Sequence, residues 1–253
     1  MFYRIEGTGI RLAGTLPALT AAQPRLPAWL YHVADQAEQL VFAADPTAAD
    51  PAAELLPANQ SLSVLAFYPA VVERWRGLGI PDKPGRLRPW AAAARIVAAV
   101  SGLQAPGVEA LLLPEARRRQ PAPIFLEAPG DRAAAENAVS LDEQLARLEH
   151  AVTQPEQAAA FDAAVHAAWQ VQNIDTVAKL LETERQAYPQ TCASVLDTRS
   201  RAWLPRLSEL AAAQRMDPRP RQTLVIVGAL HLCGEAGVVT LLAHAGHQVT
   251  RML

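Results

Sequence analysis

The carboxyl-terminal segment restricts the fold of this chain more than any other part of the sequence. An apolar run, Leu224–Val227, is followed by a glycine-rich stretch from Gly228 to Gly237, by apolar residues at helical spacing and by a β-rich segment, His247–Met252. This order predicts a buried strand, a polar turn, a helix and a second strand. His231 then lies just past the carboxyl end of the buried strand, where open α/β sheets bind their ligands.

His231 supports two interpretations. At the end of a strand, an imidazole can serve as a metal ligand, a general acid or a general base. The same position also suits a loop histidine that only bonds a nearby carbonyl group. The pattern in this segment does not decide between a functional and a structural histidine.

The amino-terminal half of the chain adds the other strands of the predicted sheet. Phe2–Glu6 and Ile10–Thr15 flank a glycine-containing turn, which predicts a β-hairpin. Leu40–Ala44 and Ile124–Leu126 are short apolar runs, and an acidic residue follows each of them directly. We expect both runs to be strands of the same sheet.

Helical spacing of apolar residues fills most of the remaining sequence. It predicts helices over 27–38, 68–78, 90–103, 107–119, 141–188 and 198–215, with Pro155 dividing the fifth and a polar connection over 131–140. We therefore expect one α/β domain over residues 1–253, in which a central mixed β-sheet is flanked by helices and carries a large helical insertion. The helices between 60 and 120 and between 140 and 217 are expected to cover the sheet.

Composition limits the classes of partner. The formal net charge is −2 and 51% of the residues are hydrophobic, as in soluble globular proteins. Without a basic stripe the sequence predicts no nucleic-acid partner, and without a long apolar run it predicts no membrane span. A small molecule or a peptide remains as the expected partner, and a homo-oligomer is compatible with this composition. Because no export signal opens the sequence, it predicts a cytoplasmic protein as it stands, or an exported one if the true start lies upstream.

The cysteines and most histidines carry no ligand spacing. Cys192 and Cys233 are too few for a disulfide framework or a cysteine-only zinc site. Cys233, two residues after His231, can approach the same pocket, but we expect it to be a small buried apolar residue. His32 is expected on an exposed helix face. The other histidines outside the carboxyl-terminal turn are expected to be solvated: His150, His166, His244 and His247.

A series of short motifs follows one order over nearly the whole chain. After the hairpin come Gly14-Thr15-Leu16-Pro17, Arg88-Pro89-Trp90-Ala91, Gly107-Val108-Glu109, Leu126-Glu127, the Arg199–Pro205 helix and the Gly228–Gly237 turn. None of these motifs is specific alone. Their order and spacing resemble the TraB/GumN family, which is related to the Tiki-type metal-dependent proteases and, more distantly, to the erythromycin-esterase and ChaN-like group.

The resemblance implies a metal-assisted hydrolytic site built from two Gly-x-x-His motifs and acidic residues. Imidazole and carboxylate groups suit a divalent metal such as Mn²⁺, Co²⁺ or Zn²⁺, which activates water or polarises a carbonyl group. This sequence departs from the family at two important positions. Pro17 stands where the first motif has its histidine, and Ala43 stands where a strand-end glutamate is expected.

The remaining candidate residues are few. For catalysis they are His231, Glu127, Arg199 and Glu109, and for metal binding they are His231, Asp45 and Glu127. The resemblance predicts that Thr15, Asp45, Glu127, Arg199 and His231 converge on one cleft at the strand ends. Each also has a structural interpretation. Glu127 can cap the next segment, and Glu109 suits the first turn of a helix. Arg199 can either pair with one of these carboxylates in a buried site or face solvent. Trp90 and Trp203 are expected in the core.

Two functions follow from these residues. A catalytic metal generally takes three protein ligands, whereas this chain retains one suitable imidazole and scattered carboxylates. We therefore favour a catalytically degenerate relative that keeps a cleft for ligand binding or assembly. The alternative is a metal-dependent hydrolase of peptide or ester bonds that uses His231 and nearby carboxylates.

Overall fold

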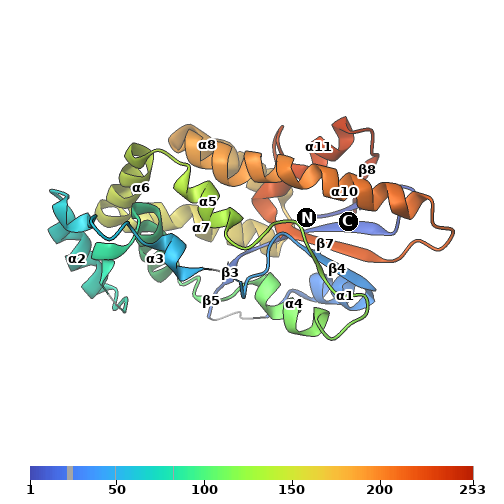
Figure 1. Cartoon of the computed structure of the whole chain (residues 1–253), viewed down its shortest axis with the longest axis horizontal. Coiled ribbons are helices and arrows are strands. Elements are labelled where there is room, and N and C mark those ends of the chain that lie inside the picture. Colours follow the sequence, from blue (N-terminus) through green and yellow to red (C-terminus); the bar gives the residue numbers. More distant parts are fainter. Residues whose placement is uncertain (22–24, 49, 82, 253) are drawn as a thin grey trace.

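A six-stranded mixed sheet forms the centre of the molecule (Figure 1). The computed structural model describes residues 1–21, 25–48, 50–81 and 83–252. The strand order is β6-β4-β7-β2-β1-β8. The strands are β1 (Phe2–Ile5), β2 (Ile10–Thr15), β4 (Gln39–Phe42), β6 (Ile124–Phe125), β7 (Thr223–Gly228) and β8 (Val249–Met252). The predicted hairpin and the other predicted strands are therefore confirmed, with bounds that differ by one or two residues.

Strand β7 lies between β2 and β4 and is parallel to both. Its residues from Thr223 to Val227 are all buried, which explains the continuous apolar run, because a parallel strand is covered on both faces. In the β2–β7 register Thr15 lies opposite Gly228. The hairpin strand β1 is antiparallel to β2 and to β8, which makes the sheet mixed.

The carboxyl ends of β2, β4, β6 and β7 meet at one edge of the sheet, because these four strands are parallel. Thr15 ends β2 and Gly228 ends β7. The amide of Glu127, just after β6, donates to the carbonyl of Ala43, just after β4. The fold thus brings distant parts of the sequence to one edge, as expected for open α/β sheets.

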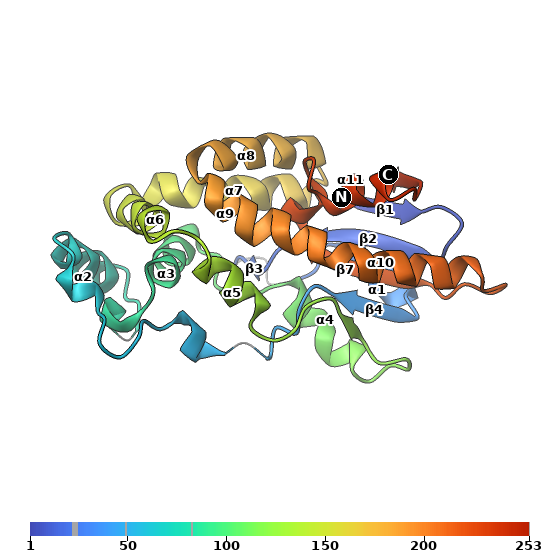
Figure 2. The ribbon, with the colours of Figure 1, turned by 45° about the horizontal axis from the view of Figure 1, so that its top comes forward.

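Helices cover both faces of the sheet. Helices α1 (Ala28–Gln36) and α4 (Val108–Ala116) lie on one side, and α10 (Arg199–Arg215) and α11 (Val238–His244) lie on the other (Figure 1, Figure 2). Their buried residues form one core cluster with the strands and with parts of α7 (Pro155–Gln170) and α8 (Ile174–Ala187).

Three further helices pack mainly on one another at the end of the molecule away from the sheet. These are α2 (Tyr68–Gly77), α3 (Pro89–Ser101) and α6 (Leu141–Thr153), whose buried residues form a second core cluster (Figure 1). The expectation that the helices between 60 and 120 and between 140 and 217 cover the sheet is therefore wrong for these three. The apolar faces of these helices are buried within the helical insertion, which α7 connects to the sheet region.

Three helical segments differ from the predictions. The stretch after Pro155 forms two helices, because α7 ends at Gln170 and α8 begins only at Ile174. Helix α5 (Asp131–Asn137) occupies the segment predicted as a polar connection. Its start is fixed by Gly130 at a φ of 94° and by Oδ2 of Asp131, which accepts a hydrogen bond of 2.9 Å from the amide of Ala128. Helix α10 continues directly from α9 (Pro189–Thr191) and a π-helical segment, Cys192–Thr198. The predicted division at Pro155 is confirmed, since α7 begins there.

The smaller elements complete the chain. Strands β3 (Ala18–Leu19) and β5 (Ala105–Pro106) form a separate two-stranded sheet, and short 3₁₀ segments lie at Pro51–Glu54, Leu62–Val64, Pro84–Arg86 and Ala229–Leu232. Within the described residues, no helix combines the length and the apolar character that crossing a membrane requires.

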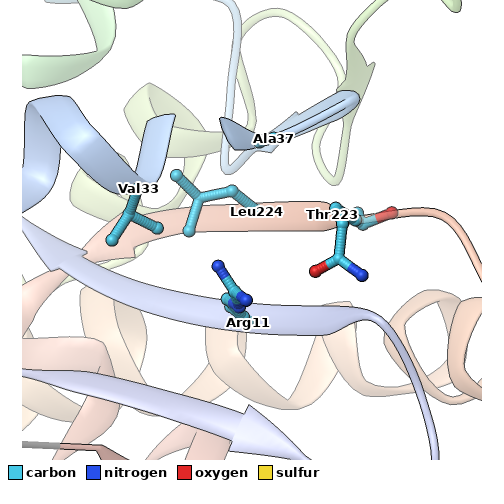
Figure 3. A pocket seen from close by; sticks show the side chains of 6 residues that line it. Arg11, Val33, Ala37, Thr223 and Leu224 are labelled. Carbon is cyan, nitrogen blue, oxygen red and sulfur yellow. The ribbon is translucent and has the colours of Figure 1, made fainter. Parts of the chain in front are cut away.

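A shallow depression without room for a buried water molecule lies at the opposite edge of the sheet (Figure 3). It is lined by Arg11, Val33, Ala37, Gln222, Thr223 and Leu224. Since Thr223 begins β7 and Arg11 lies near the start of β2, the depression is at the amino ends of these strands. It is therefore separate from the edge that carries His231.

Candidate functional site

Glu127 and Arg199 form a two-armed ion pair at the carboxyl edge of the sheet. Nε and Nη2 of Arg199 donate to Oε1 and Oε2 of Glu127 over 2.6 and 3.0 Å. The side chain of Glu127 is only 4% exposed and that of Arg199 only 12%. A planar guanidinium matches a carboxylate in this geometry, so the pair is both strong and directional. Glu127 therefore uses its carboxylate to bind Arg199, and Arg199 does not face solvent.

His231 contacts the same arginine. It lies in the short helical turn Ala229–Leu232 after β7 and is buried. Its Nδ1 is 2.8 Å from Oγ of Ser200, and its Nε2 is 3.4 Å from Nη1 of Arg199. A guanidinium can only donate, so Nε2 carries the lone pair and Nδ1 carries the proton in this arrangement. Both ring nitrogens thus have a partner.

The surroundings of His231 favour the neutral imidazole. Burial lowers its pKa well below the usual value, and the positive charges of Arg199 and Arg132 lower it further, while a hydrogen bond with the Leu196 backbone partly opposes them. The imidazole is therefore neutral at neutral pH. A neutral ring is also the form that accepts a hydrogen bond from an arginine.

Trp203 joins Glu127 to His231. Its Nε1 donates a hydrogen bond of 2.9 Å to Oε1 of Glu127, and the centres of the Trp203 and His231 rings are 4.4 Å apart. The expected core position is confirmed, because Trp203 is fully buried. Its place in the site was not predicted, although its spacing from Arg199 places both on one helix face. Ser200 was also not among the candidates.

A π-helical segment delivers Arg199 and Ser200 to this cluster. Residues Cys192–Thr198 directly precede Arg199, and the hydroxyl of Thr198 donates to the carbonyl of Ala193 over 2.9 Å. Asp197 in this segment forms a second two-armed pair with Arg185 of α8, at 2.7 and 2.9 Å. Such π-helical turns alter the direction of side chains and are frequent at functional sites.

Glu109 and Thr15 form a second contact at the same edge. Oγ1 of Thr15 lies 2.5 Å from Oε1 of Glu109 and 3.0 Å from the carbonyl oxygen of Val227. Burial raises the pKa of the Glu109 carboxyl, although Thr15 and the charge of Arg132 act in the opposite direction. A protonated Glu109 can donate to Thr15, which then donates to Val227. Glu109 as a whole is half-buried, but its carboxyl group is enclosed by protein.

Asp45 has other partners. Its carboxylate accepts from Nη2 of Arg117 at 2.6 Å and from the hydroxyl and the amide of Thr47 at 2.7 and 2.9 Å. Desolvation acts to raise its pKa, but the Thr47 and Arg117 contacts outweigh it and the pKa is lowered. In the described part of the chain, no hydrogen bond or ion pair connects Asp45 to Glu127, Arg199 or His231. Of the five residues predicted to converge, Glu127, Arg199 and His231 contact one another. Thr15 lies at the same edge of the sheet, and Asp45 pairs elsewhere.

These residues do not fit a resident metal ion. Among the described residues no group of three His, Cys, Asp or Glu side chains is placed to hold one. Both oxygens of Glu127 and Nε2 of His231 face the cationic Arg199. Pro17, in the position where the resemblance expects a histidine, has no donor atom in its side chain.

The other histidines and the cysteines stand outside this cluster. His166 and His247 are buried, so the prediction that they are solvated is wrong for both, while His244 is exposed and His150 contacts Tyr188. The prediction that Cys233 is a buried residue is confirmed. Cys192 and Cys233 are buried, and burial raises the pKa of these thiols to about 11 and about 12. Neither is a reactive thiolate.

One of three comparisons with known proteins finds a match. The model of the TraB/PrgY/gumN family matches residues 1–251. Comparison with curated proteins and with solved structures finds no match. Since the family match spans almost the entire sequence, the chain belongs to the TraB/PrgY/gumN family.

Proposed function

We propose that this member of the TraB/PrgY/gumN family is catalytically degenerate and that its strand-end region serves ligand binding or assembly, with a small molecule or a peptide as the ligand. One observation carries the proposal. The best remaining metal ligands, Glu127 and His231, are both directed at the guanidinium of Arg199. A hydrolytic metal would have to occupy space beside a fixed positive charge.

Electrostatics and ligand number both support this proposal. A second cation beside a buried guanidinium is repelled, and the repulsion is strong where water is excluded. A catalytic zinc or manganese centre generally has three protein ligands and an open position for water. Here Asp45 is engaged with Arg117, and Pro17 has no side-chain ligand. The metal-dependent hydrolase remains the alternative function, with His231 and nearby carboxylates as its ligands.

Metal content tests the proposal directly. The native chain and the His231→Ala variant are dialysed against Mn²⁺, Co²⁺ or Zn²⁺ and analysed by inductively coupled plasma mass spectrometry. We expect well under one equivalent in both proteins. His32→Ala is the matched control, because His32 is an exposed imidazole whose ring nitrogen hydrogen-bonds to Gln36.

Stoichiometric metal in the native chain, lost in His231→Ala and kept in His32→Ala, would replace the proposal with the hydrolase. The assembly part is tested separately by sedimentation over a range of protein concentrations. The ligand part is tested by thermal shift with peptide and small-molecule panels. A monomer that responds to no member of either panel would count against a binding or assembly role.

A further inference from the structure

Two arginines beside helix α5 have no partner for their positive charge. In the part of the chain that the structure describes, the guanidinium groups of Arg88 and Arg132 form no ion pair and no hydrogen bond. Nε of Arg88 is buried as well. A buried charged nitrogen without an acceptor is costly, and proteins retain one where an anion or a water molecule supplies the acceptor.

Arg88 directly precedes α3, in the Arg88-Pro89-Trp90 motif that the ion pair of Glu127 does not involve. The amide of Arg88 donates to the carbonyl of Glu54 over 2.8 Å, but the carboxylate of Glu54 binds Arg95 at 2.7 Å. The neighbouring acid therefore neutralises a different arginine, and the charge of Arg88 stays available.

Helix α5 connects the start of α3 to the carboxyl edge of the sheet. Nε1 of Trp90 donates to Oδ1 of Asn137, the last residue of α5, over 2.8 Å. Oγ of Ser194, in the π-helical segment that precedes Arg199, donates to the carbonyl of Ala135 over 2.7 Å. Both ribbon views place α5 beyond the carboxyl ends of β4 and β7 (Figure 1, Figure 2).

Arg132 lies in the first turn of α5, five residues after Glu127, and is exposed. Burial is the main cause of the pKa shifts of Glu109 and His231, and the charge of Arg132 acts to lower the pKa of both groups. The guanidinium therefore lies near both. Glu109 is not its ion-pair partner, because the enclosed carboxyl group of Glu109 contacts Thr15.

We propose that Arg88 and Arg132 bind the anionic group of a ligand, a carboxylate or a phosphate, beside the strand-end cluster of Glu127, Arg199 and His231. The inference rests on the proposed function, because it assigns a charge to the ligand of that same region. A guanidinium suits this role, since its planar fork of N–H donors matches the oxygens of either group.

The charges of the strand-end cluster favour an anion over a cation. Glu127 and Arg199 neutralise each other and are largely buried. His231 is neutral at neutral pH, because burial and the charge of Arg199 lower its pKa. The cluster therefore contributes no net charge, and Arg88 and Arg132 leave the region positive. Opposite charge is the main source of attraction for a polar ligand at such a surface.

Titration calorimetry with three probes tests the proposal at constant ionic strength. The probes are inorganic phosphate, N-acetyl-alanyl-alanine with its free carboxylate, and the uncharged carboxamide of the same peptide. We expect the native chain to bind phosphate or the peptide carboxylate in the millimolar range or more tightly, and not the carboxamide. Phosphate binding identifies a phosphate ligand, and binding of the free peptide alone identifies a carboxylate ligand.

Substitutions then assign the binding to the two arginines. Arg88→Gln and Arg132→Gln should each weaken the anion by about 10-fold or more, since each loses a hydrogen bond to a charged group. Arg132→Lys keeps the charge without the fork and should lose less. Arg76→Gln is the matched control, because Arg76 is an exposed arginine of α2 whose side chain has no ion pair among the described residues. It should bind as the native chain does.

Stability separates a binding role of Arg88 from a structural one. Arg88→Met keeps much of the side-chain length and removes a charged group without a partner, so its thermal midpoint should equal or exceed the native one, as is common for residues retained for function. A clearly lower midpoint would show that the guanidinium holds the fold and would overturn the role of Arg88. Arg132 is exposed, so its variants should fold normally and test the site independently.

The outcomes also separate this inference from the proposed function. A native chain that binds neither anion, that binds the peptide and its carboxamide equally, or whose anion binding survives both glutamine substitutions overturns the inference and leaves the degenerate assignment intact. All titrations are repeated in the presence of EDTA. Anion binding that EDTA abolishes would reveal a bound metal ion and would overturn both the inference and the proposed function.

Discussion

The indole nitrogen of Trp203 donates to Oε1 of Glu127 over 2.9 Å, the same oxygen that accepts from Nε of Arg199. One carboxylate therefore holds a tryptophan and an arginine that lie four residues apart on α10. The segment after β6 is thereby attached to α10. Because the Trp203 ring also lies against the His231 ring, this bond positions both potential metal ligands.

Replacing Trp203 with Phe tests that attachment. The variant keeps an aromatic ring and loses a hydrogen bond to a charged group, so we expect the free energy of unfolding to fall by about 2 kcal/mol. Trp169→Phe is the control, because Nε1 of Trp169 donates over 2.7 Å to the neutral carbonyl of Gly14 and its loss should cost about 1 kcal/mol. Urea unfolding measures both, and an equal or smaller loss in Trp203→Phe would contradict the role of the carboxylate.

His231 makes stability depend on pH below neutrality. Its pKa in the folded protein lies well below the ordinary value of 6.5, so the unfolded chain takes up a proton first as the pH falls. The stabilising contribution is present above about pH 6.5 and is lost as the pH falls from there toward the folded pKa. The loss can reach about 1.4 kcal/mol per pH unit for one group.

The prediction is checked by unfolding the native chain and His231→Gln in urea between pH 5 and pH 7.5. Burial also lowers the pKa of His166 and of His247, so the native slope contains their contributions too. The difference between the two proteins isolates His231. Parallel stability curves over this range would show that the imidazole is not held neutral.

The carboxyl groups of Asp162 and Glu184 should make stability depend on pH in the opposite direction, so that it falls as the pH rises. Burial raises the pKa of Asp162 on α7 and of Glu184 on α8, and Arg147 offsets this only in part. A raised folded pKa means that stability is fully present below the unfolded pKa and is lost as the pH rises through the folded one. We expect Asp162→Asn and Glu184→Gln each to raise the unfolding free energy at pH 8 by about 1 kcal/mol.

The same substitutions should have less effect at pH 4, where the native carboxyl groups already carry protons. Glu149→Gln, on an exposed position of α6, is the control and should change stability little at either pH. Destabilisation by Asp162→Asn at pH 8 would mean that the attraction of Arg147 exceeds the cost of burial. Thermal unfolding at the two pH values distinguishes these results.

The position of His231 was predictable because it depends on local order. An apolar run followed by glycine predicts a buried strand and a turn, and parallel neighbours bring other strand ends to the same edge. Thr15 and Glu127 were placed by the same reasoning. In contrast, Asp45 pairs with Arg117, the residue that directly follows α4. No periodicity in the sequence relates these two residues.

The arrangement of the helices was less predictable. Helical spacing identifies the apolar face of α2, α3 or α6, but not whether that face meets a sheet or another helix. The π-helical segment Cys192–Thr198 was also missed, because a change in helical pitch over seven residues leaves almost no trace in an apolar pattern. That segment determines how Arg199 faces Glu127. The sequence could therefore suggest the ion pair, but it could not predict the two-armed geometry.

Gly107 shows why a short motif before α4 needs a glycine. A Cβ atom at this position would overlap the carbonyl oxygen of Pro17 and would lie 2.7 Å from that of Leu16, although its φ is an ordinary −72°. Glycine is therefore required because the backbone at Gly107 approaches the backbone of Leu16 and Pro17 closely. The amide of Val108 bonds the Leu16 carbonyl at 3.1 Å, and Glu109 then reaches Thr15.

Gly107→Ala should therefore lower the unfolding free energy by about 3 kcal/mol, since backbone atoms cannot move aside as a flexible side chain can. The protection of the Val108 amide against hydrogen exchange should fall with it. Gly77→Ala is the control, because no heavy atom within 4 Å meets a Cβ at Gly77 on α2, and alanine there should stabilise by about 0.5–1 kcal/mol. If Gly107→Ala unfolds within a few tenths of a kcal/mol of the native chain, the β2 end does not approach α4 this closely, and the contact of Glu109 with Thr15 loses its support.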